Sequence, residues 1–136
     1  MNHSGDHKAD WVDFDYAYLR VVPHVHLSDS EVVGIVLHSR THGFIGIRCL
    51  LDRGRLASRW PSLDVDLLEH ELNAMEAIAE GAPGAGPIAL LPPSDRFHWL
   101  TAPRSAVLQP TEVHAGRTKD LAVTLESMAR AISGKN

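Results

Sequence analysis

Three short apolar runs near the start of the chain limit its fold more than any other feature. The runs are FDYAYLRVV (14–22), EVVGIVLH (31–38) and GFIGIRCL (43–50). They are rich in aromatic and β-branched residues, and apolar side chains occupy both alternating faces of the first, as in an inner strand. SRTH before Gly43 indicates a hairpin with a longer, bulged loop. The sequence predicts an antiparallel three-stranded meander over residues 14–50, in which Gly34 and Gly46 indicate a bulge or the close approach of another backbone.

The apolar period then lengthens from two to between three and four residues. A short helix is expected over residues 52–60, weakened by Gly54 and ended by Pro61. Ser62 is expected to cap a longer helix that runs to Gly81, because a serine hydroxyl can accept an N–H of the first turn. The apolar stripe of this helix is Val65, Leu68, Leu72, Met75 and Ala79.

The second half of the chain begins with the flexible linker GAPGAGP. Residues 96–100 and 106–109 are predicted to form two short strands, and Thr118 is predicted to cap a last helix. The stripe of that helix is Leu121, Leu125, Met128 and Ile132. The element order βββ-αα-ββ-α predicts an α+β fold, with an antiparallel sheet made of the meander and two later strands and with helices packed on one face.

Length and composition favour a single soluble domain. The 136 residues have 44% hydrophobic and 22% charged content, as in globular proteins. We expect residues 1–12 to be a disordered tail and residues 13–133 to form the domain. The polar N-terminus has no apolar core of a signal peptide, no run could cross a membrane, and a single cysteine suits a reducing cytoplasm. A net charge of −4 argues against a protein that mainly neutralises nucleic-acid phosphates.

The histidines do not form a recognised metal motif. His24 and His26 are two apart, and His38 and His42 are four apart. Zinc usually takes three or four ligands from Cys, His or carboxylates, and neither HExxH nor paired CxxC is present. We therefore interpret these histidines as solvated turn residues, with no metal and no cofactor.

Two patterns in the sequence contain residues that can act as nucleophiles. Ser105 and His114, with Asp120 beyond, contain the residue types of a hydrolytic triad, but the sequence has no GxSxG elbow. Cys49 lies in an apolar strand, where a small buried hydrophobe is the more ordinary role than a reactive thiolate. Catalysis is therefore not predicted from either pattern.

Charge is segregated between two neighbouring regions. The basic region contains Arg48, Arg53, Arg55 and Arg59 around the single acid Asp52. The acidic region contains Asp64, Asp66, Glu69, Glu71, Glu76 and Glu80 without an intervening base. Solvated helix faces or a charge-patterned surface for a partner would both produce this pattern. Nucleic-acid binding through the arginines ranks last, because no aromatic side chains interleave with them.

The stretch RFHWLTAPRSAVLQPTEVHAGRTKD (96–120) carries the most specific pattern in the chain. It contains W-L-x-x-P-R-S-x-V-x-Q-P followed by V-H-x-G-x-T-x-D. With YAYLRVVP, EVVGIVL, GFIGIRCL and LDVDLL, it resembles the uncharacterised bacterial family known as domain of unknown function 3037, over residues 16–132. Family members typically carry Asn where Val32 stands, so any polar role of that Asn is lost or transferred here.

The resemblance implies no activity, but members are often encoded beside a HipA-like kinase, which makes such a kinase a candidate partner. Within the specific stretch, local structure explains Trp99, Pro103, Pro110 and Asp120, with Gly116 expected to adopt a positive φ. Local structure also explains Thr118, as a helix cap, but it explains Arg104, Ser105, Gln109 and His114 poorly. The candidate binding residues are Arg104, Ser105, Gln109, His114 and Thr118. They precede a helix N-terminus, which favours anions.

Two functions follow from these observations. The first is a non-enzymatic interaction protein of the cytoplasm, a partner or regulator of the HipA-like kinase. The second is a small enzyme or ligand-binding protein that recognises an anionic group through Arg104, Ser105, Gln109 and His114. Convergence of these four side chains on one concavity would favour the second.

Overall fold

The computed structural model of the chain describes residues 10–23, 29–103 and 107–135. The elements, in chain order, are β1 (Val12–Val21), β2 (Glu31–Ser39), β3 (Phe44–Cys49), α2 (Arg53–Arg59), α3 (Val65–Glu80), η1 (Pro87–Leu90), α4 (Pro93–Leu100), β4 (Leu108–Pro110), β5 (His114–Thr118) and α5 (Leu121–Lys135). The α+β class, the meander and the two later strands are confirmed. β1 begins at Val12, one residue before the expected domain boundary at 13.

The five strands form an antiparallel sheet in the order β3-β2-β1-β4, with β5 also paired to β1. β4 and β5 lie in tandem along the same edge of β1, where Pro110 faces Leu19 and His114 faces Tyr16. Between these pairs the edge has one residue more than β1. Thr111 bridges the interruption, because its N–H donates to the Tyr18 carbonyl at 2.8 Å and its hydroxyl accepts the Tyr18 N–H at 2.9 Å.

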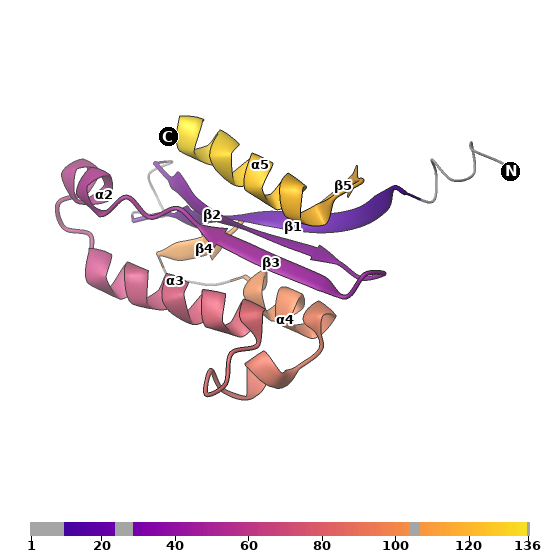
Figure 1. Cartoon of the computed structure of the whole chain (residues 1–136). Helices are drawn as coiled ribbons and strands as arrows, with labels where there is room; N and C mark the ends of the chain where they lie inside the picture. Colours follow the sequence, from indigo (N-terminus) through magenta and orange to yellow (C-terminus); the bar gives the residue numbers. More distant parts are fainter. Residues whose placement is uncertain (1–9, 24–28, 104–106, 136) are drawn as a thin grey trace, which may run out of the picture.

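Helices cover both faces of the sheet, not one face as predicted (Figure 1). On one face, α2, α3 and α4 pack on a cluster that includes Ala17 and Leu19; on the other, α5 packs on Phe14 and Ile35. The physical reason was visible in the sequence. β1 and β2 are apolar on both faces, and an apolar sheet face must be covered.

The glycines of the meander mark close approaches, as predicted. The pairing of β1 with β2 shifts between Leu19 and Arg20, which leaves Val33 as the extra residue of a bulge. A Cβ on the neighbouring Gly34 would lie 3.0 Å from the Arg48 carbonyl oxygen. At Gly46 the close neighbour is a side chain rather than a backbone, because a Cβ there would lie 2.6 Å from Leu125 Cδ2.

The helix expected after Pro61 forms with its predicted stripe buried, but its cap differs. Asp64, not Ser62, is the N-cap, and its Oδ1 accepts the N–H of Leu67 at 3.0 Å. The helix ends at Gly81, whose φ of 66° lies in the left-handed region. Asp52 caps the shorter helix α2 in the same way.

Residues 96–100 were predicted to be a strand, and this prediction is wrong, because they belong to α4. Pro93 stands at the first helical position, where a missing N–H costs nothing. Phe97 and Leu100 are both buried, which is helical spacing, whereas the prediction relied on the alternation of Phe97 and Trp99. The later strand expected over 106–109 corresponds to β4, and residue 106 lies outside the described residues.

The last helix has the predicted stripe, with Leu125 and Ile132 buried. Its cap is Asp120 rather than Thr118, because Asp120 Oδ1 accepts the N–H of Val123 at 3.1 Å. Thr118 accepts the N–H of Asp120 at 3.1 Å and bonds the Thr124 hydroxyl at 2.5 Å, so it holds the cap residue against the first turn of the helix. None of the helices in the described part of the chain has the length and apolar content that a membrane crossing requires.

Candidate functional site

The predicted binding residues do not form one compact group where the structure describes them. Arg104 and Ser105 lie outside the described residues. The other three lie along the β4–β5 edge, with Gln109 opposite Arg20, His114 opposite Tyr16 and Thr118 opposite Val12. Their partners on β1 are four residues apart, so at roughly 3.3 Å per residue neighbouring members are separated by about 13 Å. Gln109, His114 and Thr118 therefore cannot contact one small anion together.

His114 is the most accessible of these residues. Its exposed ring lies 5.6 Å from the ring of Tyr16, with an angle of 38° between the planes. Tyr16 in turn makes an edge contact with Tyr18 at 5.8 Å. Asp120, the third member of the triad pattern, caps α5 instead of contacting a histidine in the described structure. The aromatic row gives His114 a packing role.

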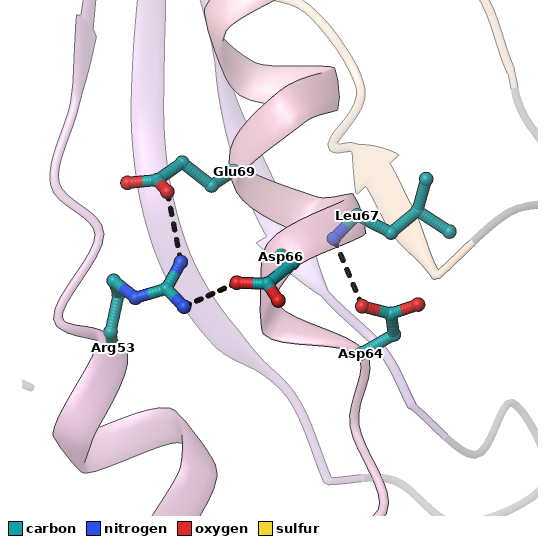
Figure 2. Close-up of polar contacts among 5 residues, drawn as sticks. All are labelled: Arg53, Asp64, Asp66, Leu67 and Glu69. Atoms are coloured by element: carbon teal, nitrogen blue, oxygen red, sulfur yellow. Dashed lines mark hydrogen bonds and ion pairs between the residues drawn. The ribbon is translucent and has the colours of Figure 1, made fainter.

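The arginines of the basic region are compensated inside the fold. Arg48 pairs with Glu126, and Arg53 bonds Asp66 at 2.5 Å and Glu69 at 2.9 Å (Figure 2). Folding thus pairs the arginines with carboxylates, of which Asp66 and Glu69 belong to the acidic region. A surface rich in uncompensated arginines, which nucleic-acid binding requires, does not form around these residues.

Glu31 is a buried carboxylate held by the two remaining arginines of the basic region. Its side chain is 4% exposed, and Arg55 and Arg59 approach it at 2.5 and 3.4 Å. A cavity of about 120 Å³ lies beside it and is lined partly by Asp52 and Ser133. Because the carboxylate is already neutralised by two guanidinium groups, this arrangement anchors α2 to the start of β2.

His38 lies under α4 and forms a polar pair that sequence reasoning missed. Its Nε2 is 3.2 Å from the Ser94 hydroxyl, and its ring stacks on Phe97 with centroids 5.0 Å apart. Burial lowers the pKa of His38, although the charge of Asp15 raises it, and Arg40 lowers it further. The expectation of a solvated turn histidine is therefore wrong for His38. His42 does lie exposed in the turn, and His24 and His26 fall outside the described residues.

Metal and thiol chemistry find no support in residues 10–23, 29–103 and 107–135. No three His, Cys, Asp or Glu side chains lie close enough together there to hold a metal ion. Burial, with a contribution from Glu76, raises the pKa of Cys49 to about 12. The thiol is therefore protonated at neutral pH, as its position in an apolar strand indicated.

An apolar groove opens between the first turns of α3 and the beginning of β4. Its volume is about 230 Å³, and the lining residues are Leu63, Asp64, Leu67, Leu68, Glu71 and Val107. Leu67 is 53% exposed and Val107 36% exposed, although both are large apolar residues. Sequence reasoning did not find this groove, since the two sides lie 40 residues apart.

Comparison with known protein families places the chain in one of them. The family described as "Protein of unknown function (DUF3037)" matches residues 16–132. The chain belongs to the DUF3037 family. No curated protein and no solved structure matches it. The match covers the whole sheet except the beginning of β1 and includes both sides of the groove, so the groove lies within the DUF3037 domain.

Proposed function

We propose that this DUF3037 protein is an interaction protein that binds a partner through the outer side of its α2–α4 layer. The observation that carries the proposal is the exposure of large apolar side chains there. Leu67, Leu90, Leu91 and Val107 are 53, 81, 39 and 36% exposed, and we call them the helical face. Leu67 and Val107 line one groove, and exposed apolar side chains that share a surface on a folded domain typically mark an interaction site.

The polar clusters of the described structure support the same proposal, because each is used to hold elements together. Arg53 joins α2 to α3, Glu31 joins β2 to α2, and Arg96 joins α4 to the end of α3. Side chains that are committed to such contacts are not poised for a reaction. A surface for association fits these arrangements better than an active centre does.

The partner we propose is the HipA-like kinase beside which members of the family are often encoded, in the bacterial cytoplasm. The test is co-purification of the two proteins, followed by measurement of kinase activity with and without this chain. Association at micromolar concentration, or a change in kinase activity, is the expected result. If the pair never associates at that concentration and the kinase is indifferent to this chain, the proposed partnership is wrong.

An anion site limited to Arg104, Ser105 and Gln109 is the alternative, because Gln109 and His114 lie too far apart to contact one small anion together. One observation favours it: among the described residues, Arg20 Nε is buried without a hydrogen-bond partner, and Arg20 lies opposite Gln109. Substitution Arg104→Lys keeps the charge and removes the planar fork of donors. If Arg104 recognises an anion, this substitution weakens phosphate binding, which a thermal-shift assay measures, and changes the free energy of unfolding by less than roughly 0.5 kcal/mol. If Arg104 is structural, stability falls by about 1–3 kcal/mol.

A further inference from the structure

We infer that the groove between α3 and β4 accepts one apolar side chain from a partner segment whose flanking residues are lysine or arginine. This inference rests on the proposed function, because it specifies the chemistry of a partner for part of the helical face. It is carried by the shape of the groove, by the exposure of Leu67 and by the charge of the rim.

The groove has the dimensions of a single side chain. Its volume of about 230 Å³ exceeds the roughly 150 Å³ of an apolar cavity that binds benzene, so it can hold a leucine or phenylalanine side chain. Four of its lining residues, Leu63, Leu67, Leu68 and Val107, are aliphatic. An apolar anchor would find contacts on several sides without displacing any element.

The fold of α3 does not require a leucine at position 67. Val65 and Leu68, its neighbours on the same helix, are only 9 and 2% exposed, whereas Leu67 is 53% exposed. A glutamine or lysine there would support the helix about equally well. The leucine therefore exposes apolar surface to solvent and contributes little to the core, as expected of a residue that contacts a partner.

The rim of the groove is acidic. Asp64 and Glu71 are among its lining residues, and none of the described lining residues is a cation. Asp64 offsets the positive end of α3 through its capping bond to Leu67, so the charge of Glu71 is left in excess. Arg53 does not compensate it, because its guanidinium bonds Asp66 and Glu69 on the other side of the helix start (Figure 2). An acidic rim around an apolar centre favours a basic segment with an apolar anchor.

The experiment uses the full chain and a labelled ten-residue peptide, with one central leucine and two arginines on each side in an alanine–serine background. Control peptides replace the four arginines by glutamate, or the leucine by serine. Binding is followed by fluorescence anisotropy and by amide chemical shifts. We expect the arginine peptide to bind at least fivefold more tightly than either control and to shift the amides of Leu67 and Val107.

Variants of the chain locate the binding. Leu67→Ser and Glu71→Lys are each expected to weaken binding of the arginine peptide at least fivefold. Their matched controls are Val123→Ser, an exposed apolar residue of α5 on the opposite face of the sheet, and Glu80→Lys, the same charge change at the other end of α3. Thermal melts establish that each variant is folded. Equal weakening by the controls, or equal affinity for the glutamate peptide, would overturn the inference.

The same variants separate this inference from the proposed function. If the HipA-like kinase associates with the chain and Leu67→Ser and Glu71→Lys leave that association unchanged, the groove inference is wrong and the proposed function stands. If the kinase does not associate but the arginine peptide binds as expected, the groove inference stands and the kinase is not the partner.

Discussion

The ring of Phe14 occupies the space into which any side chain at position 116 would project. Phe14 and Gly116 are partners on neighbouring strands, and a Cβ at 116 would lie 2.4 Å from Phe14 Cζ. The sequence predicts a positive φ at Gly116, but among the described glycines positive φ occurs only at Gly43, Gly81, Gly84 and Gly86. The glycine in V-H-x-G-x-T-x-D is therefore required for the packing of an aromatic ring, not for a turn.

Gly116→Ala should destabilise the protein by about 1–3 kcal/mol, the usual cost of overpacking, measured by urea unfolding. A matched glycine in open surroundings should behave oppositely. Gly54 lies in α2 with only Asp52 Oδ1 near a built Cβ, at 3.8 Å, so Gly54→Ala should stabilise by about 0.5–1 kcal/mol. The cost of Gly116→Ala should shrink when Phe14 is replaced by leucine. An equal cost in both backgrounds would mean that the ring is not the cause.

Arg96 fastens α4 to the end of α3, and we predict that Arg96→Lys lowers stability by about 1–3 kcal/mol. Its Nη1 donates to the Ala79 carbonyl at 2.6 Å and its Nε to the Leu91 carbonyl at 2.9 Å. A lysine cannot reproduce this planar pair of donors. Arg130→Lys, on an exposed position of α5, is the control and should change stability by less than about 0.5 kcal/mol. Equal effects at the two positions would contradict this role of Arg96.

His38 should make stability depend on pH. Burial lowers its folded-state pKa below the ordinary 6.5, so between the two values the unfolded chain binds more protons than the folded chain. The free energy of unfolding therefore rises with pH through this window and levels off above 6.5. Subtracting the urea-unfolding profile of His38→Gln removes the contribution of the other histidines. If the difference in unfolding free energy between the two proteins does not vary with pH, the pKa of His38 is not lowered by folding.

Cys49 should resist alkylation in the folded protein. Raising its pKa from 9.0 to about 12 lowers the thiolate fraction near neutral pH about a thousandfold. Iodoacetamide labelling at constant pH, followed by mass spectrometry with and without urea, measures the effect. Native labelling at the rate of the unfolded chain would exclude a buried, protonated thiol.

The elements that the sequence predicted well are those whose pattern is local. The meander and the stripes of α3 and α5 follow from periods of two and between three and four. α4 was missed because Phe97 and Trp99 alternate as in a strand, while Phe97 and Leu100 also have helical spacing. The packing of helices on both faces of the sheet could have been predicted, since residues 14–22 are apolar on both faces.

The candidate site was harder to predict because its contacts join distant segments. Ser94 and His38 are 56 residues apart, and Arg48 and Glu126 are 78 apart. No local pattern connects such residues, so the arginines appeared to be an uncompensated cluster. The groove has the same origin, because the pairing of β4 with β1 places Val107 on the side of the groove opposite Leu67.

Hydrogen–deuterium exchange, measured on the chain alone and saturated with the HipA-like kinase, tests most directly whether the helical face is the interface. We predict slower amide exchange in the complex at residues 63–71, 88–91 and 107–109, with β5 (His114–Thr118) and α5 (Leu121–Lys135) unchanged. Protection confined to β5 and α5, or no protection at saturating kinase, would contradict the proposal that the helical face binds this partner.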